Sequence, residues 1–401
     1  MKNQIKIAFA HNENGHNDKG ISAGITQYIR STGRFQLIAW PDNSFESISF
    51  LKKQGCRGAI ANIATSATAN RLLQTGIPII AYSTVQDMGK VPFISSDSRE
   101  VARIAFEYLS NKQFKNFAFF GLTEARWTRE RLKHFSDFVS QAGYSLQVFS
   151  GKPIHVANNL PGFAKLWVDT TMKRGQQDLI HWIEELPRPV AVLVSCDILG
   201  AHMSYLVSEI GLSVPDDIAI LGIDNNEALC NICSPRLSSI ALNLNKAGYD
   251  AAELLDRIIT GKEELKGQQI KIQPLQVKER GSTDIFAIND LDVIKALKYI
   301  RTHSYEPLQV EEIARHVCIS KRSLQMKFQQ ILNTSIHDEI IHSHFLIARN
   351  LLLETDLSIE NIAIQSGFHY SSNMRRAFMD FTGMLPCKYR QTHRGSQPSA
   401  R

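Results

Sequence analysis

The sequence predicts two domains of different classes: a two-lobed α/β domain, followed by an all-α domain with two helix-turn-helix units. Three observations lead to this fold class. Short β-rich runs alternate with amphipathic segments up to about residue 280. A Gly-Ser-Thr-Asp step at 281–284 then marks a boundary, because such residues favour turns. Beyond it, one helical pattern occurs twice, about 49 residues apart.

The first domain consists of apolar runs that favour strands, separated by segments with helical periodicity. Alternation at this spacing is typical of right-handed βαβ units around a parallel sheet that helices cover on both faces. The number of units favours two lobes over one sheet. We expect strands at 5–9, 35–40, 58–63, 78–83, 116–121, 191–196 and 218–223, and helices at 98–111, 128–142, 177–185 and 198–210.

The composition is that of an ordinary soluble protein, with 43% hydrophobic and 21% charged residues. No apolar run approaches the roughly 18 to 20 residues of a membrane helix, and the run at 5–10 is too short for a signal-peptide core. We therefore expect a cytoplasmic protein without a membrane partner. The six cysteines are scattered without zinc-finger spacing, so we expect buried, reduced thiols and neither a metal nor a cofactor.

The C-terminal half twice shows a short helix, a tight break and a second helix with apolar residues at i and i+4. The copies lie at 313–331 and 362–381. Ala314 and Ala363 are small enough to let the paired helices cross closely. Gly367 suits a left-handed turn residue, whereas the equivalent Cys318 gives no such signal. The pattern predicts two helix-turn-helix units.

A connecting helix is predicted at 336–354, between the two units. Acidic residues at 338–339 lie near its start, where the helix dipole favours negative charge. Its expected apolar stripe consists of Ile341, Phe345, Ala348 and Leu352.

The second helix of each copy exposes side chains suited to double-stranded DNA. Arg bonds guanine bidentately, Gln bonds adenine, and Ser or Lys can anchor phosphates. Two such units joined by one helix can enter successive major grooves, about 34 Å apart. The expected DNA-binding residues are Lys321, Arg322, Gln325, Met326, Ser371, Ser372, Arg375 and Arg376.

A family signature runs through the second copy: Ser358-Ile-Glu-Asn-Ile-Ala363, Gly367-Phe368, Arg376-Ala-Phe378, Gly383 and Pro386-Cys-Lys-Tyr389-Arg390. With it, residues from about 290 to 390 resemble the DNA-binding domain of the AraC family of transcription regulators. The resemblance implies that Arg322, Gln325 and Met326 read bases in the first unit, and Ser371, Ser372 and Arg376 in the second. The chain departs from the family pattern at Asn333, which tolerates left-handed geometry, and at His344, Met374 and Asp380.

Polar side chains follow several predicted strands of the first domain, where α/β domains bind ligands. Carboxylate and guanidinium groups can each bond two vicinal hydroxyls, and an aromatic ring offers a face to the C–H surface of a sugar. The mixture favours a neutral polyol, although an Asp at a strand end can simply cap the next helix. The expected ligand-binding residues are Asp224, Arg131, Asp197, Trp127, Arg129, Asn225, Asp97 and Asp18.

Further stretches in the first domain resemble periplasmic-binding-protein-like and Lac-repressor-type effector domains. They are Val214-Pro-Asp-Asp-Ile218, Gly222-Ile-Asp-Asn225, Pro235-Arg-Leu-Ser-Ser-Ile240 and Gly248-Tyr-Asp-Ala-Ala252. The stretch Arg129-Glu-Arg131 is similar to that family's ligand segment. Such domains cross between their lobes three times. The resemblance implies one lobe at 1–115 plus 240–265 and another at 116–239 plus 266–280.

An effector domain placed before an AraC-type domain, with the stretches at 126–131 and Val277-Lys-Glu-Arg280-Gly-Ser-Thr-Asp284, is similar to bacterial regulators of pentose catabolism. The similarity implies D-xylose as the effector, operator DNA as a partner, a homodimer, and RNA polymerase as a partner of an activator. The expected domains are a sugar-binding effector domain at 1–280, a linker at 281–289, the AraC-type domain at 290–392 and a flexible tail at 393–401.

Other functions stay open on the residues alone. The same architecture can sense a different sugar or small metabolite. An α/β enzyme is disfavoured because no GxGxxG follows the first strand and neither a Walker loop nor a GxSxG elbow occurs. A transport binding protein leaves about the last 120 residues without a role. The scattered cysteines do not favour a DNA-repair protein with a reactive thiol.

Overall fold

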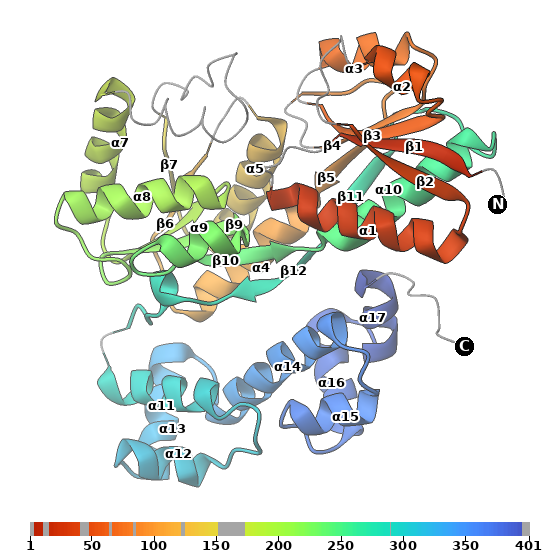
Figure 1. Ribbon diagram of the computed structural model, residues 1–401. Coiled ribbons are helices and arrows are strands. Elements are labelled where there is room, and N and C mark those ends of the chain that lie inside the picture. The colour runs from red at the N-terminus through yellow and green to blue at the C-terminus, as the bar shows by residue number, and fades with distance from the viewer. Residues whose placement is uncertain are drawn as a thin grey trace. The chain divides into compact units, whose positions relative to one another are not determined.

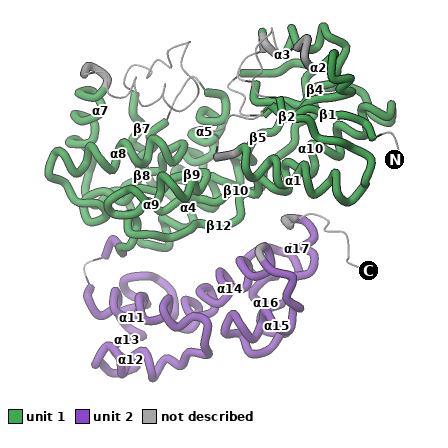
Figure 2. Tube along the Cα trace, viewed as in Figure 1, with its two compact units in different colours: residues 1–285 green, residues 286–401 purple. Residues whose placement is uncertain are grey.

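The computed structural model describes residues 4–10, 16–40, 48–63, 66–82, 86–121, 125–150, 173–288 and 290–394. The chain forms two compact units, residues 1–285 and residues 286–401 (Figure 2). Unit 1 is α/β and unit 2 is helical (Figure 1), which confirms the predicted fold class.

The first lobe of unit 1 is built on a six-stranded sheet in the order β11-β5-β4-β3-β1-β2, with all its neighbours paired in parallel. Helices α1 and α10 cross closely, because a Cβ on Gly24 or Gly248 would lie within 2.1 Å of a carbonyl oxygen of the other helix. The strands are β1 (Ile5–Ala10), β2 (Phe35–Trp40), β3 (Gly58–Asn62), β4 (Ile79–Tyr82), β5 (Phe93–Ser96) and β11 (Gln269–Ile272). The helices are α1 (His16–Thr32), α2 (Ile48–Lys53), α3 (Ser66–Leu73) and α10 (Leu244–Ile259).

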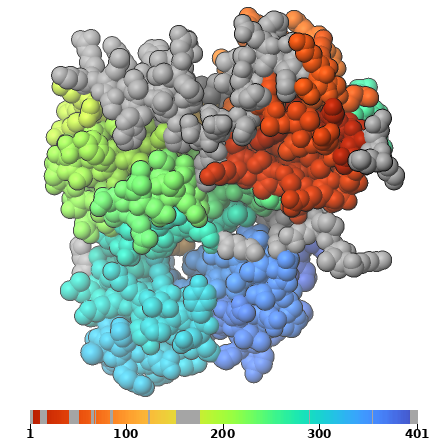
Figure 3. All heavy atoms as spheres, in the orientation of Figure 1, coloured from red at the N-terminus to blue at the C-terminus, as the bar shows by residue number. Residues whose placement is uncertain are grey.

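The second lobe is built on a sheet in the order β12-β10-β9-β8-β6-β7, in which only the β10–β12 pair is antiparallel. In Figure 3, red atoms of α1 and green atoms of α8 and α9 form the visible surface over the two sheets. The strands are β6 (Phe117–Phe120), β7 (Leu146–Val148), β8 (Val190–Val194), β9 (Ile218–Asp224), β10 (Ser238–Leu242) and β12 (Pro274–Lys278). The helices are α4 (Ser98–Asn111), α5 (Arg126–Gln141), α7 (Lys173–Glu185), α8 (Asp197–Glu209) and α9 (Glu227–Ile232).

The chain crosses between the lobes three times, as expected, but the predicted crossing points are wrong. Helix α4 packs on α5, and β10 pairs with β9, so both belong to the second lobe. Strand β11 pairs with β5 and belongs to the first. The crossings therefore lie near residues 97, 243 and 273. The resemblance gives the number of crossings but not the residues at which they occur, which explains the error.

Unit 2 contains the two predicted helix-turn-helix units, joined by a connecting helix with the predicted bounds. The first unit packs Ile313, Val317, Leu324 and Phe328 into one apolar core. In the connecting helix Ile340 is buried and Ile341 only half-buried, contrary to the predicted stripe. The helices are α11 (Leu291–Thr302), α12 (Val310–Val317), α13 (Lys321–Leu332), α14 (Ile336–Glu354), α15 (Ile359–Gln365), α16 (Ser371–Thr382) and α17 (Pro386–Arg394).

Both helix-turn-helix turns contain left-handed residues. Gly367 has a φ of +79° and Cys318 a φ of +64°, so the expectation for Cys318 is corrected. The Cys318 N–H closes α12 by donating to backbone carbonyls, and its exposed side chain meets no packing conflict. Asn333, with a φ of +53°, ends α13 in the left-handed geometry that its side chain tolerates.

Residues near the predicted linker and tail are partly built into the two units. Ser282 and Thr283 are buried in unit 1, on the short 3₁₀ helix η2 (Gly281–Thr283), and Phe286 is in the core of unit 2. Helix α17 extends two residues into the predicted tail at 393–401, and residues 289 and 395–401 lie outside the described residues.

The expectation of buried thiols holds only in part, because Cys318 and Cys387 are exposed. Among the described residues, no helix is long and apolar enough to span a bilayer. The same residues contain no cluster of three His, Cys, Asp or Glu side chains arranged to hold a metal ion.

Candidate ligand and DNA-binding sites

Arg131 is the centre of a buried polar cluster. It lies on α5, is 4% exposed, and donates from Nη1 to the Ser195 carbonyl and from Nη2 to Ser96 Oγ at 3.0 Å. Its guanidinium carbon also lies 4.9 Å from the ring centroid of Trp127. Because Ser96 ends β5, the Arg131–Ser96 bond joins the two lobes.

Two carboxyl groups share this cluster with Arg131. Burial raises the pKa of Asp224, and the charge of Arg131 opposes that rise. Burial and the neighbouring Asp224 raise the pKa of Asp197. Burial in turn lowers the pKa of the Arg131 guanidinium, against the attraction of Asp224. With one cation for two acids, the cluster suits a neutral ligand rich in hydroxyl groups better than an anion.

Asp197 uses its carboxylate within the protein. Oδ1 accepts from Ser239 Oγ at 2.5 Å, and Oδ2 accepts from the Asn226 N–H at 2.6 Å and from Cys230 Sγ at 3.4 Å. A Cβ on Gly222 would lie 2.2 Å from Oδ1, so glycine is required there. These contacts give Asp197 a positioning role at the 224–226 turn rather than a free face for a ligand.

The turn at the end of β9 is strained, with a φ of +112° at Asp224 and +52° at Asn225. Ser239 Oγ accepts from the Asn225 N–H at 3.0 Å, and Arg280 Nη2 donates to Asn225 Oδ1 at 2.8 Å. Strained backbone persists where surrounding bonds over-determine it, often at ligand sites. The turn therefore holds Asp224 beside Arg131.

Asp18, Asp97 and Arg129 have different surroundings. Asp18 lies in the first turn of α1 rather than in the preceding loop, and it is buried beside the Tyr82 hydroxyl at the carboxyl edge of the first sheet. Asp97 caps α4 and also accepts from Lys271 Nζ at 3.4 Å. Arg129 is exposed on α5.

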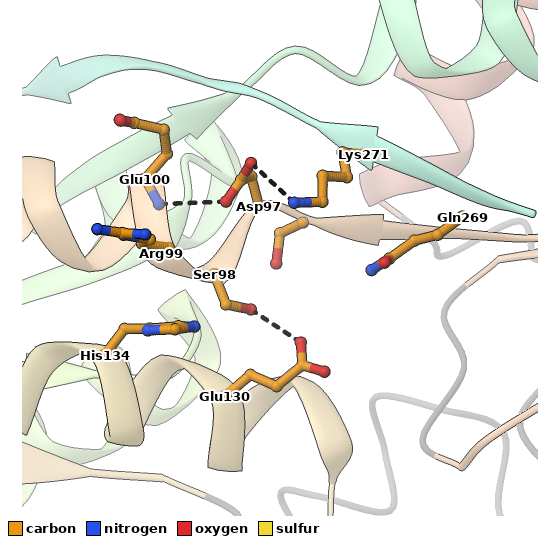
Figure 4. Close-up of a pocket in the computed structure, with 9 residues that line it drawn as sticks. Asp97, Ser98, Arg99, Glu100, Glu130, His134, Gln269 and Lys271 are labelled. Atoms are coloured by element: carbon orange, nitrogen blue, oxygen red, sulfur yellow. Dashed lines mark hydrogen bonds and ion pairs between the residues drawn. The ribbon is translucent and has the colours of Figure 1, made fainter.

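A hollow of about 440 Å³ lies where α4 begins (Figure 4). In Figure 4, Ser98 and Glu130 face each other, and Ser98 Oγ donates to Glu130 Oε2 at 3.3 Å. Asp97 is the one predicted ligand residue that lines this hollow, and Ser96 is common to the hollow and the Arg131 cluster. The lining residues are Ser96, Asp97, Ser98, Arg99, Glu100, Glu130, His134, Gln269 and Lys271.

Several members of the cluster, among them Thr128, Ser195 and Cys196, were not predicted from the sequence. Thr128 Oγ1, Ser195 Oγ and Arg131 Nε are buried without a hydrogen-bond partner among the described residues. A Cβ on Gly121 would lie 2.8 Å from Ser195 Oγ, so the strand end fits closely around them. Cys196 is also there, and burial with Asp224 raises the pKa of its thiol to about 12. A hydroxyl that directly follows an apolar strand is the signal that could have found Ser195, whereas Thr128 on α5 carries no such signal.

The recognition helices α13 and α16 present the predicted DNA-binding side chains. Leu324 and Phe328 of α13, and Met374 and Phe378 of α16, are fully buried. The predicted residues lie on the other faces of these helices. Of these, Ser371 is half-buried, and the exposed ones are Lys321, Arg322, Gln325, Met326, Ser372, Arg375 and Arg376.

The two recognition helices differ in the pairing of their cations. Lys321 Nζ lies 2.6 Å from Glu311 Oε1. Lys327 Nζ lies 2.8 Å from Asp290 Oδ2 and also contacts Asp292. Within the described part of the chain, neither Arg375 nor Arg376 of α16 has a carboxylate partner.

Comparison with protein-family models separates the chain in the same way. Residues 106–283 match a periplasmic binding protein-like domain, and residues 313–392 match a helix-turn-helix domain. The chain joins an effector domain to a DNA-binding domain. This is the architecture of a ligand-responsive transcription regulator.

Known proteins share this architecture over nearly the whole chain. The xylose operon regulatory protein of Haemophilus influenzae is 28% identical over 392 residues, which cover 96% of this regulator and 98% of that protein. The solved structure of xylose-binding transcription activator xylR is 25% identical with a TM-score of 0.58, and the match covers 98% of this chain and 100% of that one. These full-length relatives are regulators rather than enzymes, which supports the expectation that this chain is not an enzyme.

The Lac repressor dimer bound to operator and the anti-inducer ONPF shares the fold alone. It is 18% identical with a TM-score of 0.51, and the match covers 70% of this regulator and 82% of that chain.

Proposed function

We propose that this regulator binds D-xylose in unit 1 and operator DNA through unit 2, and that it activates genes of pentose catabolism. One observation carries the proposal: a single chain holds a buried site with polyol chemistry and two exposed recognition helices. Relatives that match along nearly the whole chain are named for xylose, which supports this sugar over others.

In unit 1, Arg131 and Asp224 are the proposed direct contacts. The Arg131 fork donates to vicinal hydroxyls, and the Asp224 carboxylate accepts from them. Trp127 offers its ring to the C–H surface, beside the guanidinium. Asp18 is proposed to contact the sugar from the first lobe, whereas Arg129 is exposed and Asp97 caps a helix.

In unit 2, base reading is proposed for Arg322, Gln325 and Met326 of α13 and for Ser371, Ser372 and Arg376 of α16. Met326 is 53% exposed, and an apolar side chain on a recognition helix suits a thymine methyl group. The proposed phosphate contacts come from Lys321 and Arg375.

The proposed switch is closure of the two lobes around the sugar. The Arg131–Ser96 bond already links the lobes at the site. The sugar must bind the DNA-competent arrangement more tightly than the alternative, because equal affinity for both shifts nothing. We also propose a homodimer, by analogy with the Lac repressor dimer of the same fold, a cytoplasmic location, and RNA polymerase as the partner of the activator.

Isothermal titration of the full chain with D-xylose, L-arabinose and D-ribose tests the sugar assignment. We expect saturable binding of D-xylose that Asp224→Ala abolishes. The matched control is Asp137→Ala, an exposed aspartate on α5 of the same lobe, which should bind the sugar normally. Binding of none of the three sugars would contradict the pentose assignment and leave the DNA-binding domain untouched.

A further inference from the structure

The segment that leads out of unit 1 is bonded directly to the candidate ligand site. Arg280 donates from Nη2 to Asn225 Oδ1 at 2.8 Å and from Nη1 to the Leu237 carbonyl at 2.9 Å. The chain then continues through η2 to Ile285, the last residue of unit 1, and Phe286, the first of unit 2. Only five residues, 281–285, therefore separate the partner of Asn225 from the DNA-binding unit.

The segment after Arg280 is fixed to the strands that carry the site. Ser282 Oγ donates to the Ile220 carbonyl of β9 at 2.6 Å and accepts from the Ser238 N–H of β10 at 2.8 Å. Thr283 Oγ1 donates to Ser238 Oγ at 2.6 Å. Both Ser282 and Thr283 are completely buried. A buried segment with satisfied hydrogen bonds cannot absorb a shift locally, so it moves with these strands.

Helix α4 holds the same segment from a second side. The hydroxyls of Tyr108 and Thr283 are 2.7 Å apart, and the buried Lys112 pairs with Glu279 at 2.7 Å. The other end of α4 follows Ser96, which bonds Arg131. Both routes from the cluster, one through the Asp224–Asn225 turn and one through α4, therefore end on residues 279–283.

We propose that Arg280 transmits ligand occupancy from the Asp224–Asn225 turn to the DNA-binding unit. The proposal rests on the proposed function, because it requires a ligand at Asp224. Arg280 is a positioning residue, because its guanidinium bonds the Asn225 side chain and the Leu237 carbonyl. A planar fork fixes the relative orientation of its acceptors, and a positive-φ turn has few alternative conformations. A sugar that shifts the turn therefore shifts the exit segment.

The test measures coupling in the full chain. Affinity for an operator duplex, selected from a random library, is determined with and without saturating D-xylose, and the ratio of the two is compared between variants. Couplings between sites typically amount to about 5- to 150-fold. In Arg280→Gln we expect the ratio to fall to about 2-fold or less, while the operator affinity without sugar stays within about 2-fold of wild type.

A second variant removes the other half of the bond. Asn225→Gly deletes the acceptor and suits the φ of +52° at that position, so it does not strain the turn. If the two residues act through their shared bond, the double variant loses no more coupling than either single variant. The matched control is Arg257→Gln on α10, which removes an arginine paired with Glu263 and Glu253 away from the turn, and its ratio should equal that of wild type.

The outcomes separate this inference from the proposed function. A wild-type chain whose operator affinity does not respond to any of the three sugars contradicts the proposed function, whatever the variants do. A wild-type response that persists in full in both Arg280→Gln and Asn225→Gly overturns the role of Arg280. The role is overturned equally if Arg280→Gln loses the response only because it no longer binds D-xylose in the titration.

Discussion

The two helix-turn-helix units of unit 2 follow one plan but stabilise it differently. In the first, the recognition helix α13 pairs Lys321 and Lys327 with carboxylates of unit 2 and leaves Arg322 without a carboxylate partner among the described residues. In the second, α16 carries Arg375 and Arg376 without a carboxylate partner among the described residues. The turns differ as well, because Cys318 is exposed whereas Gly367 is pressed against the buried His344.

The difference shows that a repeated fold need not divide its function equally. Cations already paired within the protein release less free energy on meeting phosphates than unpaired ones do, so α16 should contribute more of the salt-dependent DNA affinity. The second unit also depends on a close contact between a glycine and a histidine, which makes it the more sensitive to pH and to substitution.

Acid should destabilise the second helix-turn-helix unit before the first. Burial lowers the pKa of His344 from about 6.5 to about 4; a bond to the Glu306 backbone opposes this shift, and the charges of His369 and His337 reinforce it. Because this pKa is depressed in the folded chain, the neutral His344 side chain contributes fully to stability above about pH 6.5, and this stability is lost as the pH falls toward 4. At pH 5 the loss for His344 is about 2 kcal/mol.

A second histidine on α14 adds to this effect. Burial and nearby Arg349 and Arg301 lower the pKa of His342 to about 4, and its ring lies 5.4 Å from that of Phe381. Hydrogen exchange at pH 7 and pH 5, corrected for intrinsic rates, should show protection lost at 359–391 more than at 310–332. His344→Leu should lose less protection on acidification. Equal losses in the two units would contradict the difference.

Gly367→Ala should destabilise the second unit by about 2 to 3 kcal/mol. The new Cβ would lie 2.6 Å from His344 Nε2, at a φ of +79° that disfavours any side chain. Cys318→Ala is the matched control, because it keeps a Cβ at the equivalent left-handed position of the first unit and should change stability little. Hydrogen exchange of the full chain measures both. A Gly367→Ala chain with wild-type protection would show that the turn tolerates a side chain.

Removal of a recognition-helix arginine should weaken operator binding by about 1 to 3 kcal/mol. Arg322→Ala and Arg376→Ala should each relax specificity at one base pair if the side chain reads a base. The assay is competition binding against a panel of single-base operator variants. A loss that is uniform across the panel would instead assign that arginine to a phosphate. Arg315→Ala, on α12, controls for the loss of a positive charge outside the recognition helices.

Glu311→Gln should produce the smallest effect and in the opposite direction. The substitution removes the carboxylate that holds Lys321, and a released lysine can meet a phosphate. We expect DNA affinity to rise about 2- to 5-fold, and the slope of log affinity against log salt to steepen by about 1. Glu360→Gln, in the first turn of α15 in the second unit, is the matched control. An unchanged salt slope would mean that Lys321 does not reach DNA.

Much of the fold follows from periodicity, which decides long amphipathic helices well. Helices α4 and α14 have the bounds that the sequence predicts, because an apolar face along many residues leaves little choice of register. The lobe to which β10 or β11 belongs could not be predicted, because the residues of a short strand do not indicate which other strand it pairs with. The left-handed conformation of Cys318 was not predicted because the backbone bonds that end α12 impose it, and the side chain does not.

The candidate ligand site was predictable only where a polar or charged side chain follows a strand in the sequence. Arg131 and Asp224, both predicted to bind the ligand, lie in one cluster. Their contact with a sugar stays a prediction. The positioning role of Asp197 depends on Ser239 and Asn226, which lie 42 and 29 residues away in the sequence. The role of Arg280 depends on β12 returning to the second sheet, so no local pattern could reveal it.

The central claim is that one chain couples sugar binding to DNA binding. The most direct test is the fluorescence anisotropy of a labelled operator duplex titrated with the full chain at one fixed salt concentration, with and without saturating D-xylose. The account predicts that the sugar changes operator affinity by about 5-fold or more. Identical binding curves in the presence and absence of the sugar, from a chain that binds the duplex, would contradict it.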